Sequence, residues 1–495
     1  MKITGKLFYF VFALICVCLF SCEDKAGKTS KEQKENNYVN KWIYKEMSTY
    51  YFWNKHLPKK PNYYLNPNDF FQSICYWYDK NTNPDGDRFS WIQDNYEDLM
   101  NMLSGISSDE IGFEFMLYLT QDKSVVGEIQ YVKKNTPAQY AGLKRGQFFS
   151  EINGITITES NYYDVLTNLK GNFSITLHDV GLENGMITFK TSEVKTISTI
   201  PNYPDNPIFL DTVYTINNKN IGYLVYNFFA DDPNNDSKQY DIELANVFSD
   251  FKQKNIEDLI VDLRYNSGGS AEAAIYLASM LVKNRSTKNI YYTVEYNSLI
   301  MKDINSNPKE YGDDFLNTYF TDKITPQHVL PNINNNLQNL MFLTGQHTAS
   351  ASEMVINGLK PYMSITLLGD TTVGKNVGSM TFTDEKNPDR NKWGIQPIIA
   401  KFYNSNGESD FTAGFFPDIV DLDNYFPKYD LGDLREGLLR HAIEHITGVP
   451  SPAFLKSSGA KPQRASLRSI DASVSRKAWT NKIVMPEGSL PKLDE

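Results

Sequence analysis

The second half of the chain alternates short apolar runs with longer stretches of helical periodicity. Across residues 195–450 the runs that predict buried strands and those that predict helices follow one another in turn. The predicted strands are residues 220–226, 258–263, 339–343 and 364–368, and the predicted helices are residues 271–283 and 349–360. Strands that alternate with helices indicate a mixed α/β core.

Residues 105–180 have a different pattern, in which short strand-like segments are separated by glycine turns. Residues 125–131 and 173–177 predict strands, and residues 160–169 predict a short helix. Asn153-Gly154 is typical of a tight hairpin turn. We therefore expect a small β-rich domain here, ahead of the α/β core.

Both flanks of these two regions are less regular. Residues 39–104 are rich in Trp and Tyr and are interrupted by four prolines, which predicts a small helical domain with an aromatic core. A carbohydrate-binding surface is the alternative interpretation of these aromatics. Residues 451–495 hold eight Lys/Arg against four Asp/Glu with little periodicity, which predicts a basic low-complexity tail, disordered or loosely held on the surface.

The N-terminus carries an apolar run over residues 7–20, preceded by Lys2 and Lys6. The run is shorter than the roughly 20 residues of a membrane-spanning helix and is typical of a secretory signal. It ends in Ser21-Cys22, which resembles a bacterial lipobox. We expect residues 1–21 to be a lipoprotein signal peptide, Cys22 to be lipidated, and residues 22–38 to form a tether to the bacterial cell envelope, at the outer membrane or the periplasmic face. A plain signal peptide or a buried N-terminal helix is the alternative.

Composition narrows the possible partners. The 495 residues suffice for two to four domains, and the formal net charge of −10 comes without a run of Lys/Arg in the body of the chain. This distribution argues against nucleic acid as a partner. Loss of the signal and lipidation of Cys22 would leave Cys75 as the last free cysteine of four, so we expect no internal disulfide.

Three segments of the α/β region carry candidate chemistry. Residues 262–269 (DLRYNSGG) run from a strand into the Gly268-Gly269 turn, whose uncovered backbone N–H groups suit an oxyanion hole. Residues 348–353 (TASASE) place Ser350 at a helix N-terminus, where the dipole favours negative charge. A structural capping box formed by Ser350 and Glu353 is the alternative.

The third segment, residues 369–379 (GDTTVGKNVGS), places Lys375 between glycines after a strand. A lysine acts as a base only when burial lowers its pKa from about 10.4, because desolvation disfavours the ammonium. The alternative is an anion-binding lysine in a glycine-rich loop.

Together the three segments resemble the C-terminal processing peptidases, or tail-specific proteases. The resemblance implies a ClpP/crotonase-like serine protease core in which Ser350 is the nucleophile and Lys375, 25 residues later, is the general base. It further implies an oxyanion hole from the N–H groups of Ala351 and of Gly268 or Gly269. Ser379 stands where many members carry a Gln that holds the lysine, so we expect an orienting role for its hydroxyl.

Residues 105–180 resemble the PDZ domains of such proteases. The resemblance implies that backbone amides around Ile111, Gly112, Phe113 and Glu114 bind the C-terminal carboxylate of a peptide, which adds a strand to the domain. A bulge at Gly112 is the alternative. The implied function is a serine endopeptidase that acts on proteins with free C-terminal tails and uses no cofactor.

Two other functions stay open at this point. One is a non-catalytic peptide- or ligand-binding lipoprotein on the same fold. The other is a metallopeptidase, since His441 and His445 lie in the order His-Ala-Ile-Glu-His. A metal site explains none of the three core segments, so we expect no metal.

Overall fold

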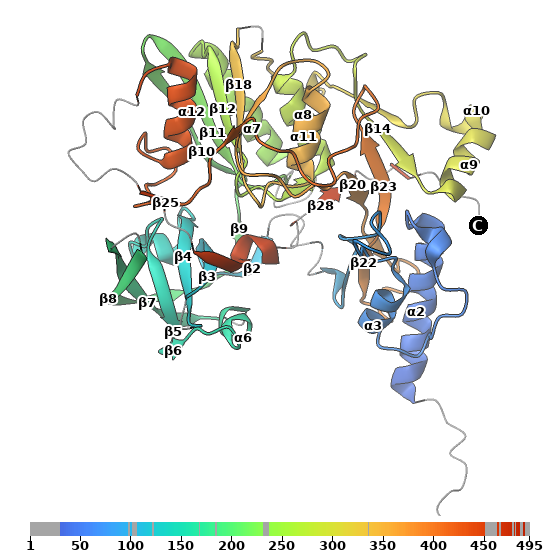
Figure 1. Cartoon of the computed structure of the whole chain (residues 1–495). Coiled ribbons are helices and arrows are strands. Elements are labelled where there is room, and N and C mark those ends of the chain that lie inside the picture. Colours follow the sequence, from blue (N-terminus) through green and yellow to red (C-terminus); the bar gives the residue numbers. More distant parts are fainter. Residues whose placement is uncertain are drawn as a thin grey trace, which may run out of the picture.

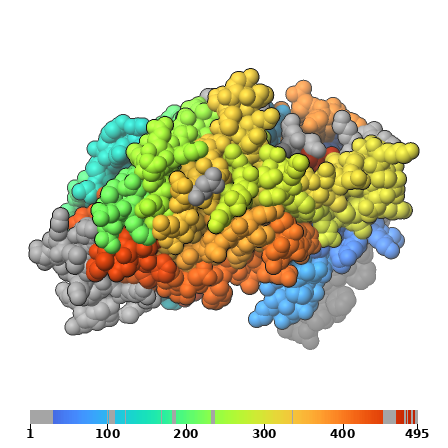
Figure 2. All heavy atoms as spheres, turned by 90° about the horizontal axis from the view of Figure 1, so that it is seen from above, coloured from blue at the N-terminus to red at the C-terminus, as the bar shows by residue number. Residues whose placement is uncertain are grey.

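A computed structural model describes residues 30–490, except residues 98–99, 101–105, 121–122, 168, 184–185, 231–236, 335, 451–462, 465–466, 478–479, 481 and 486–488. The predicted signal peptide and Cys22 lie outside the described residues. The α/β core lies at the top of Figure 1, with a β-rich domain below it on one side and a helical N-terminal region on the other. Seen from above, in Figure 2, the core covers most of the face.

The α/β core is built on a six-stranded sheet in the order β10-β11-β12-β18-β19-β24. Its strands are β10 (Ile208–Ile216), β11 (Lys219–Tyr226), β12 (Asp258–Asp262), β18 (Asn339–Thr344), β19 (Thr366–Gly369) and β24 (Ile419–Val420). From β11 onward the pairing is parallel, and β10 is an antiparallel edge. The predicted strands and helices of this region are confirmed to within a few residues.

Helices cover both faces of this sheet. They are α7 (Gln239–Gln253), α8 (Ala271–Leu281) and α11 (Ala351–Leu359) on one face and α12 (Gly437–Thr447) on the other. Within β12, Leu259 and Val261 belong to the first hydrophobic cluster and Ile260 to the second, as the two-residue period of a strand requires. Both faces are apolar, which explains why the strands appear in the sequence as continuous apolar runs.

A second six-stranded sheet of the core follows the order β13-β28-β20-β23-β14-β15. Its strands are β13 (Gly268–Ser270), β28 (Lys482–Val484), β20 (Val377–Ser379), β23 (Ile398–Tyr403), β14 (Ile290–Tyr296) and β15 (Asn317–Tyr319). The chain between β14 and β18 forms α9 (Ser298–Ser306), α10 (Pro308–Tyr311), β15, β16 (Lys323–Thr325) and β17 (His328–Val329). This sheet contains β13, which begins with the Gly268-Gly269 turn, and β20, which contains Ser379.

The β-rich domain is a sheet in the order β27-β3-β4-β5-β7-β8, with β6 paired to β5. Its elements are β2 (Ile106–Glu110), β3 (Phe113–Leu119), β4 (Val125–Val132), α5 (Pro137–Tyr140), β5 (Phe148–Ile152), β6 (Ile155–Thr156), α6 (Tyr162–Thr167), β7 (Asn172–Glu183), β8 (Met186–Ser198) and β9 (Ile200–Pro204). The predicted β-rich region is therefore longer than residues 105–180, because β8 pairs along β7 and β9 returns to β2.

A buried ion network joins the β-rich domain to the core. Arg145, in the turn before β5, lies 3.0 Å from Asp423 and 3.3 Å from Glu436. Arg264, which follows β12, donates to Glu436 over 2.7 Å. Removing one partner of such a buried network leaves an uncompensated charge, so these contacts fix the domain against the core.

The N-terminal region contains α2 (Lys31–Tyr50), η1 (Asn54–His56), α3 (Pro67–Ile74) and β1 (Trp91–Gln93). Most of its aromatics are core, as expected, and pack against Ile395 and Ile398 of the α/β core, whereas Tyr64 and Tyr78 are exposed. β1 pairs with β22 (Gly394–Gln396), which also pairs with β21 (Phe382–Thr383). The predicted tether over residues 22–38 is wrong from residue 31 onward, because Ser30 caps a helix that starts there. Among the described helices, none combines the length and the apolarity needed to cross a bilayer.

The expectation of a disordered or loosely held tail over residues 451–495 is wrong for the part of this range that the structure describes. Its described parts form β26 (Gln463–Arg464), β27 (Arg468–Ala472), η2 (Ser473–Arg476) and β28, and β26 pairs with β25 (Tyr425–Phe426). In Figure 1 a red ribbon of this segment lies against the β-rich domain below the core, and β28 lies beside β20. These strands are short and pair with distant segments, so local periodicity gave no sign of them.

Candidate active site

Ser350 is the residue before α11 and has an unusual backbone conformation. Its φ is 64° and its ψ is −113°, a region that costs energy for any residue with a Cβ. The side chain is fully buried, and among the described residues Oγ has no hydrogen-bond partner. A strained serine with an uncommitted hydroxyl at a helix N-terminus is typical of a nucleophile.

The buried carboxylate of Glu353 connects the serine to the lysine loop, which we define as residues 372–376. Its Oε2 accepts from the backbone N–H groups of Ser350 and Lys375, each over 2.8 Å. Its Oε1 accepts from Thr372 Oγ1 over 2.5 Å and from Gly374 N over 2.6 Å. Because both backbone nitrogens are 2.8 Å from the same oxygen atom, the backbones of Ser350 and Lys375 lie close to one another.

Glu353 was expected only as a possible cap of the helix. It does cap Ser350, and it also holds the lysine loop, so one side chain has both roles. Burial raises the pKa of Glu353, and the four donors act in the opposite direction. The sequence signal for this residue was the Ser-x-x-Glu spacing, which did not reveal the second contact.

Lys375 is fully buried beside the N-terminal region. Its Nζ lies 5.1 Å from the centre of the Phe89 ring. Arg88 donates to the carbonyl oxygens of Gly374 over 2.6 Å and Thr412 over 3.1 Å. Arg88 and Phe89 thus hold the lysine loop from a region that sequence reasoning treated as a separate helical domain.

Ser379 lies in β20, four residues after the lysine, and is fully buried. Its Oγ donates to the carbonyl oxygen of Ile483 in β28 over 3.4 Å. Met485 N donates back to the carbonyl oxygen of Ser379 over 3.2 Å. Ser379 is therefore in contact with the C-terminal strand.

The Gly268-Gly269 turn has positive φ values of 109° and 134°. A Cβ on Gly269 would lie 2.0 Å from the carbonyl oxygen of Phe229, so only glycine fits there. The N–H of Gly268 donates to Asn266 Oδ1 over 3.0 Å. Ala351 is the first residue of α11, where backbone N–H groups lack helical acceptors.

Asn266 is a residue that sequence reasoning did not assign to the site. Besides holding Gly268, its carbonyl oxygen accepts from Ala349 N and Ser352 Oγ, each over 3.1 Å. Its Nδ2 donates to Tyr226 O over 2.8 Å. Asn266 thereby fixes the glycine turn against the residues that flank Ser350.

His347 lies three residues before Ser350 and lines a cavity of about 230 Å³ between the β-rich domain and the core. Burial lowers the pKa of His347 to about 4. Its Nε2 is buried without a hydrogen-bond partner among the described residues. His441, by contrast, lies on α12, where its Nδ1 is 2.6 Å from Asp421.

The predicted peptide-binding residues Ile111–Glu114 lie where β2 passes into β3. Gly112, with φ of 88°, donates its N–H to the side chain of Glu110 over 2.9 Å. Phe113 pairs with Val132 of β4. The Gly112 amide expected to bind a peptide carboxylate is thus bonded to a carboxylate of this chain.

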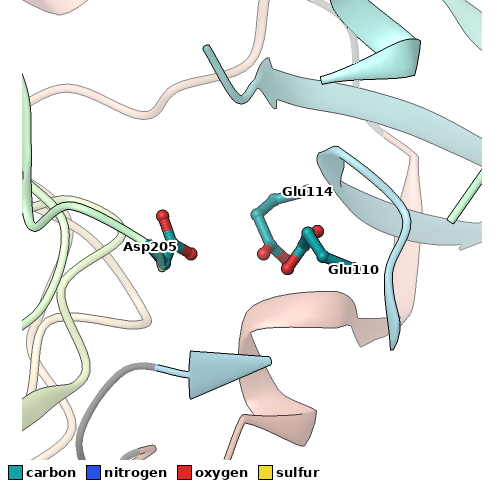
Figure 3. Close-up of side chains that lie close together, drawn as sticks. All are labelled: Glu110, Glu114 and Asp205. Carbon is teal, nitrogen blue, oxygen red and sulfur yellow. The ribbon is translucent and has the colours of Figure 1, made fainter. Parts of the chain in front are cut away.

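Two buried glutamates and an aspartate surround that loop. We call Glu110, Glu114 and Asp205 the acidic cluster, and Figure 3 shows their carboxylates facing one another. Of the residues that the structure describes, these are the sole three whose carboxylate, imidazole or thiol groups could share a metal ion, so His441 and His445 form no such group. Lys133 contacts all three carboxylates, with Nζ 2.8 Å from Glu110 and 3.1 Å from Glu114.

Comparison with known proteins agrees with this geometry. Residues 220–421 match Peptidase family S41, and residues 38–91 match the Peptidase S41 N-terminal domain, which together span about half of the chain. Carboxy-terminal processing protease CtpA of Bacillus subtilis is 25% identical over 343 residues, or 68% of this chain and 62% of the relative. C-terminal processing peptidase, chloroplastic, of Tetradesmus obliquus is 22% identical over 57% of this chain and 54% of its own.

The chain thus spans less than two thirds of these curated relatives. A solved structure assigned to the S41 proteases, from Bacteroides fragilis, is similar over 82% of this chain and 97% of its own, with a TM-score of 0.66 and 26% identity. The matched ranges include the glycine turn, Ser350, the lysine loop and the N-terminal residues that hold it. The chain therefore belongs to peptidase family S41.

Proposed function

We propose that this protein is a serine endopeptidase with Ser350 as nucleophile and Lys375 as general base. The observation that carries the proposal is the Glu353 carboxylate, which holds the backbones of both residues on one oxygen atom. A capping role alone would not need the second contact. Proximity of a nucleophile and a base fixed by a buried carboxylate is what acyl transfer requires.

In the proposed reaction the neutral amine of Lys375 takes the proton of Ser350 Oγ, which bonds to the carbonyl carbon of a peptide. This step requires the neutral form of the amine, because only that form has a lone pair to accept the proton. The lysine then gives the proton to the leaving amine as the C–N bond breaks. Water attacks the resulting ester, and the serine is regenerated.

The developing oxyanion would be held by the N–H of Ala351 at the α11 N-terminus and by a donor of the Gly268-Gly269 turn. The Gly268 N–H is already bonded to Asn266, so a donor from this turn would need a shift of the turn on substrate binding. Asn266 would keep this turn close to Ser350. Ser379 would orient the amine of Lys375, and in this structure its Oγ donates to the carbonyl oxygen of Ile483.

The β-rich domain would act as a PDZ-type module that presents protein tails to this site. The pairing of β27, a segment of the same chain, with the edge of β3 supports strand addition as the binding mode. We also propose that Cys22 anchors the protein by a lipid to the bacterial cell envelope, at the outer membrane or the periplasmic face.

An unfolded protein substrate, incubated with wild type, Ser350→Ala and Lys375→Arg, tests the proposal. Only the wild type should produce new peptides, because Arg cannot supply a neutral amine. Thermal unfolding of all three proteins controls for misfolding. If folded wild type and both variants cleave nothing under all conditions, the non-catalytic binding lipoprotein is the better interpretation.

A further inference from the structure

The C-terminal segment, defined here as residues 467–485, contacts two separate parts of the molecule. Its first half pairs with the β-rich domain through β27, and its second half enters the core sheet as β28. In Figure 1 the first half lies with the β-rich domain below the core, and β28 lies in the core beside β20. Both contact regions are those that the proposed function assigns to substrate.

The first half forms β27, which is the edge strand of the β-rich sheet and lies next to β3. β27 pairs antiparallel with β3, with Arg468 opposite Leu119 and Ala472 opposite Met116. The chain therefore runs along β3 toward the Ile111–Glu114 loop. Addition of a strand to a sheet edge is a common mode of peptide recognition, and here a segment of the same chain provides that strand.

Beyond β27 the segment does not end in a carboxylate but continues into η2. Ser473 Oγ accepts from Phe115 N over 2.7 Å and donates to Glu114. Lys477 Nζ then lies 3.2 Å from Glu110 and 3.0 Å from Glu114. A basic side chain thus occupies the place where the sequence predicted an anionic ligand.

Charge balance explains why a cation belongs there. The acidic cluster has three carboxylates, and Lys133 supplies one positive charge, so Lys477 reduces an excess of negative charge in a buried place. Burial by itself raises the pKa of Glu110, but the two ammonium groups lower it well below its ordinary value. Burial by itself lowers the pKa of Lys477, but the carboxylates of Glu110 and Glu114 raise it above its ordinary value. The side chain therefore stays charged although it is largely buried.

The second half lies across the candidate active site. β28 runs parallel to β13, which begins at Gly268, and parallel to β20, which begins two residues after Lys375. It therefore fills the space between the glycine turn and the lysine side of the site. Ile483 is buried and lines a small cavity with Met354 of α11 and Phe402 of β23.

We propose that the C-terminal segment is a built-in inhibitor that occupies the peptide-binding edge and the catalytic cleft at the same time. This rests on the proposed function. The complete burial of Ser350 and Lys375 fits a closed state. Because the segment is part of the same chain, its effective concentration at both sites is high. A free peptide must therefore bind both sites to compete with it. The site accommodates an extended strand whose Ile470 packs on the core of the β-rich domain, followed by a basic residue, Lys477.

The test uses the full chain with a cleavage sequence for a site-specific protease inserted after residue 455, so that the protein folds with its segment in place. Cutting and removing the segment should raise the rate of substrate cleavage at least tenfold. A synthetic peptide of residues 463–490 should restore inhibition, and the same peptide with Lys477→Glu should inhibit at least tenfold less well. A peptide with Lys477→Arg should act as the unchanged one.

A binding measurement separates this inference from the proposed function. The labelled peptide should bind cut, segment-free Ser350→Ala protein by fluorescence anisotropy, whether or not the protein is a peptidase. In the intact chain Lys477→Glu should raise activity, while Lys144→Glu, a charge reversal at an exposed position of the β-rich domain, should leave it unchanged.

Three results would contradict the proposal that the C-terminal segment is an inhibitor. One is an intact wild type as active as the cut protein. Another is a cut protein that loses its fold or its activity, since β28 would then be a structural strand. The third is cleavage of residues 467–485 in wild type but not in Ser350→Ala, seen by mass spectrometry, which would make the segment a substrate.

Discussion

Replacement of Glu353 tests the contact that joins the serine to the lysine loop. In Glu353→Gln the side chain keeps its shape, but an NH2 group replaces one of two oxygens that each accept two hydrogen bonds. If NH2 faces Ser350 and Lys375, two buried N–H donors lose their acceptor. If it faces Thr372, that hydroxyl can rotate and accept instead, so its own O–H must turn to another acceptor and Gly374 N is the one backbone donor that loses its partner.

The second orientation costs less and should be adopted. One unsatisfied buried donor costs about 1–3 kcal/mol of unfolding free energy. Glu353→Leu removes all four acceptor contacts and should cost at least about 4 kcal/mol by the same measure. The ordering of wild type, Gln and Leu therefore follows from the number of donors left without an acceptor.

Urea unfolding in a Ser350→Ala background measures these differences without self-cleavage. Glu310→Gln, at an exposed position on α10, is the matched control and should stay within about 0.5 kcal/mol of the background. In the active protein Glu353→Gln should lower kcat and leave KM nearly unchanged, because it loosens the loop that carries the base. Wild-type stability and kcat in Glu353→Gln would refute this role for the carboxylate.

Three further predictions concern the base, a buried histidine and the anchor. Lys375→Ala and Lys375→Arg should both abolish peptide cleavage measured by chromatography, and Ser379→Ala should retain more activity than either, because Ser379 positions and does not react; a nearly active Lys375→Arg would refute the assignment. Because burial lowers the pKa of His347 to about 4, the unfolded chain takes up its proton first as the pH falls below about 6.5, so stability should decrease between pH 6.5 and 4. His347→Gln should flatten that part of a urea-unfolding series, and an unchanged slope would contradict it. Cys22→Ser should move the protein from the membrane to the soluble fraction on an immunoblot, and continued membrane association would argue against the anchor.

The sequence predicted the α/β core well because its strands are buried on both faces and its helices α8 and α11 are almost wholly buried, which gives apolar segments separated by polar turns. It did not predict the C-terminal strands, since β28 has three residues and is held by β13 and β20, which lie more than 100 positions away in the chain. The basic composition of the tail suggested a solvated surface, whereas Lys477 lies against buried carboxylates.

The candidate site was predictable only in part, for related reasons. Ser350 and Lys375 stand out by their flanking residues, but the contacts of Glu353 and Asn266 that fix them depend on the folded loops. The expected carboxylate-binding amide of Gly112 is bonded to Glu110, a partner two residues away whose side-chain direction no pattern reveals.

The central claim is that Ser350 is the attacking group. The most direct measurement compares peptide release from an unfolded substrate by wild type and Ser350→Ala, each with the C-terminal segment intact and removed, at equal folded concentration. We predict peptide release by the wild type, fastest without the segment, and none by Ser350→Ala in either form. Equal release by Ser350→Ala would contradict the claim.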